Sequence, residues 1–443
     1  MITGPWQLLT AAGSVITLLG LMWLVRRLAR ARDLPAEVQR KLVHIGTGLY
    51  ALTLPWLFTD RWPVFVLIAL TLVAMAILRL PAIANRGLGS TLHSVERQSW
   101  GDILLALAVL TVFLLSNGNP ILYVLPLAIL TLADAAAALT GSRYGRAFFP
   151  VEDGVKSVEG SVAFFTVTLI LSMVCLLLLS EVSREGVILL SIIVAAFATQ
   201  VEAESWRGFD NFFLPAGVAI FLDGHLDDAP HQLILIAVAF IAVTWAFLGA
   251  ARHLGLSAHT ARVYVIAIFV LISATALQNV VLPTLVFVAH GLARRFNPSD
   301  AAHPELDIVA TLALVSFGWL GLGLAAGYNA LDFWGVTCAS LCVGLVALAV
   351  QPLRGPLRYI LPIAMAAALL MLWRQVAPMN MPMTGWTVEL TPLAVVSLTL
   401  CILIPMTTPR LFATGRAGRL AGLALVAPLS GFAWSAARME GWV

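Results

Sequence analysis

The sequence predicts an all-α, polytopic integral membrane protein with about 15 transmembrane or re-entrant helices. Of its 443 residues, 60% are hydrophobic and 11% are charged, and the mean hydropathy is +0.94. This charged share is well below that of a soluble domain. Apolar runs long enough to cross a bilayer recur from end to end, without the alternating pattern of a membrane β-barrel. The formal net charge of +3 says little about partners, and no nucleic-acid ligand is expected.

The first predicted helices fix the orientation of the chain. The apolar run over residues 6–25 has no basic segment before it and no clear cleavage site, which favours a retained helix over a signal peptide. The positive-inside rule places the basic segment of residues 26–41 in the cytoplasm. Counting spans from there puts residues 79–102, 141–157 and 202–211 on the same face. Charged groups at a membrane boundary are costly, so these four loops predict a functional face.

Asp134 is a lone carboxylate inside the apolar run that precedes residues 141–157. It lies about two helical turns before that loop. A carboxylate in this position is costly unless it is paired or bound to a cation. Two interpretations stay open. One is an ion pair between helices, and the other is a ligand of Mg²⁺, which prefers one or two carboxylates together with phosphate oxygens.

The loop after Asp134 has the residue types of a phosphate site. Its glycines permit tight turns near a ligand, and its basic residues supply positive charge, although Arg143 is equally explained as a membrane anchor. A helix is predicted to begin near Val158, and its free N–H groups and dipole suit an anion. The pattern of a soluble P-loop is absent. The predicted nucleotide-binding residues are Gly141, Arg143, Gly145, Lys156, Ser157, Gly160 and Ser161.

The other cytoplasmic loops add ionisable groups. Lys41 and His44 share one face at the start of the second predicted helix. Glu202 and Asp210 follow a later helix and are candidate metal ligands beside Asp134. For each loop the alternative is an ordinary solvated or membrane-anchoring segment. The remaining residues of interest in these loops are Arg40, Glu96, Arg97, Gly101, Asp102 and Asn211.

Five motifs occur in a fixed order along the first half: RKLVH, ERQSWGD, DAAAALTGSRYGR, KSVEGS and VEAESWRGFDN. Together they resemble the CTP-dependent polyprenol kinase family, which includes phytol kinases, dolichol kinases and CTP-using diacylglycerol kinases. A more distant likeness links them to phosphatidate cytidylyltransferases. The resemblance covers about residues 40–222, and it departs from the family in the acidic VEDG before Lys156 and in ESWRGF before Asp210. The matching residues are Arg40, Lys41, His44, Glu96, Arg97, Gly101, Asp134, Gly141, Gly145, Lys156, Ser157, Glu159, Gly160, Ser161, Glu202, Asp210 and Asn211.

The resemblance implies transfer of a phosphoryl group from CTP to a long-chain lipid alcohol, with Mg²⁺ as the metal. On this interpretation Asp134, Lys156 and His44 are catalytic. Asp134, Glu202 and Asp210 are the predicted metal ligands. A cytidylyltransferase that makes a CDP-lipid is the alternative. A transporter is the third hypothesis, and it would require ionisable groups near the midplane and two matching halves.

The predicted organisation has two parts. Residues 1–225 form the catalytic membrane domain, and residues 226–443 form an additional polytopic membrane domain of unknown role. In the second part, Pro283 is expected to divide an apolar stretch that is too long for one span. The expected partners are the lipid alcohol and membrane lipids. The expected location is the bacterial inner (plasma) membrane, with the active site facing the cytoplasm.

Overall fold

The computed structural model describes residues 5–58, 60–79, 100–151, 154–251, 253, 255–328, 330–380 and 390–439. Over these residues the protein is almost wholly helical, and ten helices are long and apolar enough to cross a membrane. Three shorter apolar helices of 10–17 residues accompany them. The prediction of an all-α polytopic membrane protein is confirmed, and several of the roughly 15 predicted segments fold as shorter helices.

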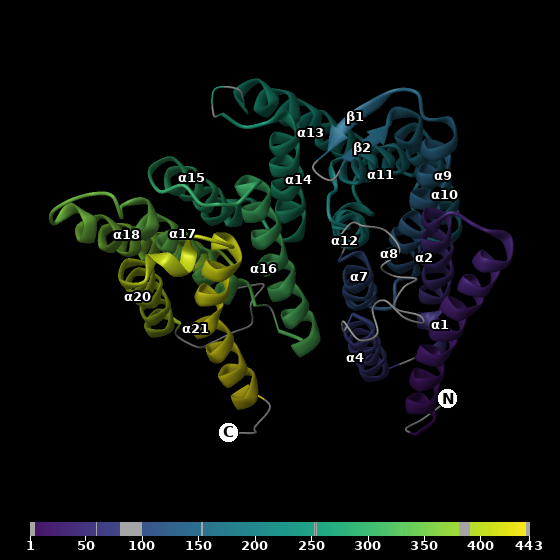
Figure 1. The fold of residues 1–443 in the computed structure, drawn as a ribbon, viewed down its shortest axis with the longest axis horizontal. Helices are drawn as coiled ribbons and strands as arrows, with labels where there is room; N and C mark the ends of the chain where they lie inside the picture. Colours follow the sequence, from purple (N-terminus) through teal and green to yellow (C-terminus); the bar gives the residue numbers. More distant parts are fainter. Residues whose placement is uncertain are drawn as a thin grey trace. The chain divides into compact units, whose positions relative to one another are not determined.

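The chain divides into two compact units, Met1–Gly249 and Ala250–Val443 (Figure 1). The predicted boundary after residue 225 falls in the loop before α13 (Pro230–Ala251), whereas the division falls at the end of that helix. The roles assigned to the two parts stay predictions.

The first unit is a bundle whose innermost helices carry polar groups at one end. The run from Pro120 to Tyr144 is largely buried, and α12 is buried along most of its length. The elements of this unit are α1 (Pro5–Arg32), α2 (Ala36–Leu52), α3 (Leu54–Leu57), α4 (Arg61–Leu78), α7 (Gly101–Ser116), α8 (Pro120–Ala128), η1 (Ile129–Ala133), α9 (Asp134–Tyr144), β1 (Phe148–Val151), β2 (Gly154–Ser157), α10 (Val158–Leu179), α11 (Arg184–Glu204), α12 (Asp210–His225) and α13.

A π-helical turn interrupts the buried run and ends directly before Asp134. Asn119 caps the run by accepting a hydrogen bond from the backbone N–H of Ile121, and Pro120 occupies its first turn. The π-helical turn η1 separates α8 from α9. Such turns are uncommon and occur frequently at functional sites, because they redirect the side chains that follow.

A short antiparallel hairpin, which the all-α prediction did not include, connects α9 to α10. Phe149 of β1 pairs with Lys156 of β2. Ser157 ends the hairpin and caps α10, because its Oγ accepts a hydrogen bond from the backbone N–H of Gly160 at 3.0 Å. The predicted start of the helix near Val158 is therefore confirmed, and the hairpin places Lys156 one residue before the cap.

The second unit is built around α17 (Leu331–Ala349), which is buried almost along its whole length: 94% of its most apolar 18 residues are buried. Helices α15, α18, α20 and α21 pack against it. Pro283 does not divide residues 263–292 as predicted. The break lies at residues 275–280, and Pro283 lies in the first turn of α15, where proline removes no helical hydrogen bond. The elements are α14 (Ala258–Ala274), η2 (Leu277–Val280), α15 (Val281–Phe296), α16 (Pro304–Ala326), α17 (Leu331–Ala349), α18 (Leu357–Met379), α20 (Thr391–Thr407), η3 (Pro409–Phe412) and α21 (Arg416–Met439).

Candidate functional site

Asp134 forms a buried ion pair with Lys41. The Nζ atom of Lys41 donates to both carboxylate oxygens, at 2.7 and 2.6 Å, and the two side chains are 8% and 10% exposed. The partners come from α2 and from the start of α9, 93 residues apart in the sequence. Of the two interpretations that the sequence left open, the ion pair between helices is present. Metal binding by Asp134 stays a prediction.

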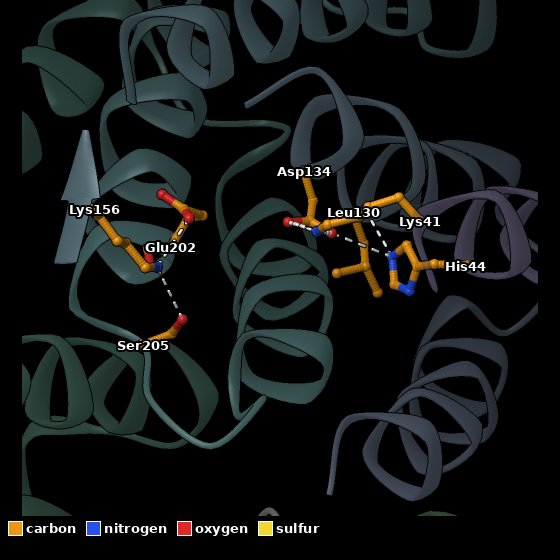
Figure 2. A network of polar contacts seen from close by, with 7 residues as sticks. All are labelled: Lys41, His44, Leu130, Asp134, Lys156, Glu202 and Ser205. Carbon is orange, nitrogen blue, oxygen red and sulfur yellow. Dashed lines mark hydrogen bonds and ion pairs between the residues drawn. The ribbon is translucent and has the colours of Figure 1, made fainter. Parts of the chain in front are cut away.

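His44 joins this pair from the same face of α2 (Figure 2). Its Nε2 lies 3.5 Å from Asp134 Oδ2 and 3.2 Å from the carbonyl oxygen of Leu130, which belongs to the π-helical turn. The close approach of α2 to this turn depends on Gly48, because a Cβ atom there would lie 2.1 Å from Thr131 Oγ1. Glycine in α2 therefore allows Lys41 and His44 to reach the start of α9.

Lys156 forms the second ion pair of the site, in which Glu202 is buried and the lysine side chain is 23% exposed. Its Nζ donates to Glu202 Oε1 at 2.8 Å, to the backbone carbonyl of Glu202, and to Ser205 Oγ at 3.2 Å (Figure 2). Burial by itself would lower the pKa of Lys156. The negative charges of Glu202 and Asp210 outweigh burial and hold this pKa above its ordinary value, so Lys156 is positively charged.

Asp210 is a carboxylate of this site without a lysine partner. It is half-buried at the start of α12, and its carboxylate lies outside the ion pairs that join the lysines to Asp134 and Glu202. Its charge acts on His44, Lys156 and Glu202. The ends of α2, α9, β2, α11 and α12 thus bring six predicted residues into one electrostatic network: Lys41, His44, Asp134, Lys156, Glu202 and Asp210.

The glycines of the predicted phosphate loop bring α9 and α10 together. A Cβ atom on Gly141 would lie 2.6 Å from Ser157 Oγ, and one on Gly160 would lie 3.0 Å from the carbonyl oxygen of Ala137. At Gly145 a Cβ atom would lie 2.4 Å from the carbonyl oxygen of Gly141. These positions require glycine for helix packing, which positions Ser157 and Lys156. Contact with a nucleotide stays a prediction.

A phytol kinase from Synechocystis sp. is 34% identical to this chain over 219 residues, which is 47% of this chain and 89% of that protein. The chain belongs to the phytol kinase family. No family model matches the chain, and no solved structure matches it. The likeness to phosphatidate cytidylyltransferases stays a prediction.

In this phytol kinase family member, the site differs from the rest of the chain in the type of its basic residues. Of its 26 basic residues, only Lys41 and Lys156 are lysines, and all others are arginines. Both lysines pair with buried carboxylates of the network. Lysine is a compact point charge on a flexible stem, whereas arginine is a planar fork. The placement of the two lysines is therefore visible in the sequence, and the motifs alone do not indicate it.

The carboxylates do not form an all-protein metal cage. Among the residues whose placement is described, no group of three or more His, Cys, Asp or Glu side chains could hold a metal ion. Lys41 engages both oxygens of Asp134, and Lys156 engages Glu202. The donor set fits a Mg²⁺ ion that is carried by nucleotide phosphates and takes one or two protein carboxylates, as Mg²⁺ commonly does.

The other motif residues have varied surroundings. Glu96 and Arg97 lie outside the described residues. Arg143 is exposed with its guanidinium 5.5 Å from the centre of the Tyr144 ring. Glu159 accepts a hydrogen bond from the backbone N–H of Ala147 at 3.3 Å. The remaining members are Arg40, which is exposed, Gly101 and Asn211, which are buried, and Ser161, whose hydroxyl donates to the carbonyl oxygen of Ser157.

The sequence motifs predict no role for Arg79 or Ser205. Arg79, at the end of α4, pairs with Asp102 in the first turn of α7, and its guanidinium lies 5.0 Å from the centre of the Trp100 ring. The backbone N–H of Trp100 donates to the carbonyl oxygen of Arg207 at 3.2 Å. These contacts join the segment before α7 to the turn that carries Ser205, and only the packing of the helices reveals them.

Proposed function

We propose that this protein transfers the γ-phosphoryl group of CTP to a long-chain isoprenoid alcohol such as phytol, at the cytoplasmic face of the membrane. The observation that carries the proposal is the 34% identity to a phytol kinase over 89% of that protein's length. The site supports it, because both lysines of the chain meet carboxylates there. The apolar tail of such an alcohol is stabilised in lipid by about 0.8 kcal/mol per CH₂. Its hydroxyl is therefore expected to enter between helices.

In this proposal, Lys156 and the first turn of α10 bind the phosphates of the nucleotide. Lys156 supplies a point charge, and the positive end of the α10 dipole favours an anion. The backbone N–H groups of Val158 and Gly160 already donate to the Ala147 carbonyl oxygen and to Ser157 Oγ, so the dipole and the lysine are the proposed attraction. Bound Mg²⁺ would offset the negative charge on the β- and γ-phosphates, and Asp210 would hold it together with Asp134 or Glu202. Phosphoryl transfer needs mainly such positioning and charge neutralisation.

His44 is the proposed general base. The alcohol oxygen forms a bond to the γ-phosphorus, the bond from that phosphorus to the bridging oxygen breaks, and CDP leaves. The hydroxyl proton passes to Nδ1 of His44, because Nε2 is the nitrogen that faces two acceptors, Asp134 and the Leu130 carbonyl, and carries the N–H. Asp134 in this scheme also favours the charged imidazolium that forms.

The test uses membranes that contain the full-length protein and CTP labelled on either the α- or the γ-phosphate. Phytol, other isoprenoid alcohols, dolichol and diacylglycerol serve as acceptors, and γ-labelled ATP serves as the alternative donor. Transfer of the γ-label from CTP to an isoprenoid alcohol supports the proposal. Transfer of the α-label supports the cytidylyltransferase instead. Absence of label from every lipid contradicts both enzyme hypotheses and leaves the transporter.

The cytoplasmic placement is tested by cysteine labelling. The four natural cysteines are buried and are first replaced. We expect Ser142→Cys and Ser205→Cys to react with a membrane-impermeant maleimide only from the cytoplasmic side. Glu181→Cys, in the exposed loop at the other end of α10, is the matched control and should react only from outside. Reaction of Ser142→Cys from outside would contradict the proposed orientation.

A further inference from the structure

The second unit contains a buried histidine whose ring nitrogens have no partner among the residues that the structure describes. His290, on α15, is 5% exposed, and both of its ring nitrogens are buried without a hydrogen-bond partner. A neutral imidazole has one N–H donor and one acceptor, and leaving both unpaired in a protein interior is costly. Native proteins rarely keep such groups unless a ligand, an ion or water pairs with them.

The charges that surround His290 are positive. Both Arg294 and Arg416 act on it electrostatically. Arg294 lies one helical turn further along α15. Arg416 is 6% exposed, and its guanidinium donates to the carbonyl oxygens of Phe412 at 3.3 Å and Pro298 at 3.4 Å. The two backbone contacts fix Arg416 in place, so its position does not depend on a bound anion.

The start of α21 adds to this positive region. Arg416 is the first residue of this 24-residue helix. The first N–H groups of a helix have no carbonyl partner inside it, and they carry the positive end of the helix dipole. The imidazole of His290, the two guanidinium groups that act on it electrostatically and the helix that begins at Arg416 therefore belong to the same end of the second unit, and each of them favours an anion.

Two carboxylates interact with Arg294 and Arg416, and neither of them pairs with His290. Glu305 forms an ion pair with Arg294, and Asp300 acts electrostatically on Arg416. Asp300 is exposed, and its backbone N–H donates to the carbonyl oxygen of Ala413. Neither carboxylate accepts a hydrogen bond from the imidazole. An added anion would compete with Glu305 for Arg294.

This end of the second unit is rich in arginine. Side chains and backbone tie its loops together, as in the hydrogen bonds from Asn297 to the Leu348 carbonyl and from Gln351 to the Pro405 carbonyl, each at 3.0 Å. The positive-inside rule assigns such an end to the cytoplasm, where phosphorylated metabolites and lipid headgroups are both accessible. The arginines are Arg294, Arg295, Arg354, Arg358, Arg410, Arg416 and Arg419.

We propose that His290, Arg294 and Arg416 form a binding site for a phosphate group, with His290 as the hydrogen-bond donor inside it. The ligand is a phosphate monoester or a pyrophosphate, because His290 and Arg294 of α15 and Arg416 of α21 together favour a group with several negatively charged oxygens. Its source is either the headgroup of a membrane lipid or a soluble phosphate. The proposal is independent of the reaction proposed for the first unit.

The test measures binding to the full-length protein in nanodiscs through the shift in its unfolding temperature. One arm uses phosphatidylcholine nanodiscs with added inorganic phosphate or pyrophosphate. The other uses nanodiscs that contain phosphatidic acid and no free phosphate. We expect His290→Leu and Arg294→Gln to weaken binding about tenfold, the usual scale for a charge-assisted hydrogen bond. Glu305→Gln should tighten it, because it frees Arg294.

Matched variants separate this site from other anion sites. Arg410→Gln removes one exposed charge from the same end and should leave binding within about twofold, because isolated surface charges contribute little. Lys156→Ala reports any anion bound in the first unit, and it should not change the part of the signal that His290→Leu removes. Binding in only one arm identifies the source of the phosphate. Absence of binding in both arms, or equal binding by His290→Leu and the parent protein, overturns the proposal.

Discussion

The two units differ in how they use buried polar groups. In the first unit, buried carboxylates meet lysines: Asp134 pairs with the buried Lys41, and Glu202 pairs with the partly buried Lys156. In the described part of the second unit, neutral side chains join buried helices, and the buried guanidinium of Arg416 donates to backbone carbonyl oxygens. Examples of the neutral contacts are the reciprocal amide hydrogen bonds of Asn279 and Asn380 and the hydroxyl contact of Ser340 with Ser397 at 2.8 Å.

This difference distinguishes contacts that hold helices together from the contacts that we propose take part in the reaction. Neutral hydrogen bonds between membrane helices contribute a modest amount, on average about 0.6 kcal/mol. Burying two charges requires their desolvation, and a buried pair is often no more stabilising than apolar residues of the same shape. The second unit shows that this chain can pack helices without such pairs. The ion pairs of the first unit therefore indicate a functional use.

The largest expected effect comes from breaking the Lys41–Asp134 pair. Asp134→Asn should reduce lipid phosphorylation at least about 10³-fold, and it should destabilise the protein by about 3 kcal/mol because Lys41 is left charged and unpaired. The double variant Lys41→Met, Asp134→Leu should recover stability and stay inactive. Activity is measured with labelled CTP and stability by thermal unfolding. Recovery of activity in the double variant would show that the pair is only structural.

The second largest effect tests why the site uses lysine. Lys156→Arg keeps the charge, but a planar guanidinium cannot reproduce contacts with the Glu202 carboxylate, its backbone carbonyl and Ser205. We expect a loss of activity of about 10²-fold with a raised KM for the nucleotide. Exchanging an exposed arginine such as Arg410 for lysine is the control and should change neither parameter. Full activity of Lys156→Arg would remove the special role of lysine.

A smaller loss is expected for the general base. His44→Gln should lower kcat about 10²-fold or less, leave the KM for the nucleotide near its normal value, and abolish the acid side of the pH–rate profile. The measurement is the initial rate across pH at saturating alcohol and nucleotide. A profile that keeps its shape in this variant would assign the proton transfer to another group, such as Asp210.

The smallest effect should come from the neutral contacts of the second unit. Ser340→Ala and Ser397→Ala are each expected to lower the free energy of unfolding by about 1 kcal/mol or less. Phosphorylation of the lipid alcohol should stay unchanged. Loss of activity in either variant at full folded yield would mean that the buried hydroxyls of the second unit support the reaction, and the contrast between the units would fail.

Local features were predictable because their causes lie in short stretches of sequence. Length and hydropathy predict spans, since a bilayer requires a fixed length of apolar helix. The start of α10 at Val158 follows from Ser157, whose hydroxyl oxygen accepts a hydrogen bond from the backbone N–H of Gly160. The π-helical turn before Asp134 and the β-hairpin before Ser157 have no comparable local signal, and neither was predicted.

The sequence alone determined the membrane class, the polar loops and the family likeness, because hydropathy, charge position and motif order are properties of the chain itself. The sequence also shows that two of the 26 basic residues are lysines. Only the tertiary structure decided which charges meet. Lys41 lies 93 residues from Asp134, and Lys156 lies 46 residues from Glu202. Either a metal ion or an ammonium group can stabilise a buried carboxylate, so the sequence alone does not show which of them is the partner. The packing of the helices shows it, because it brings Lys41 within hydrogen-bond distance of Asp134.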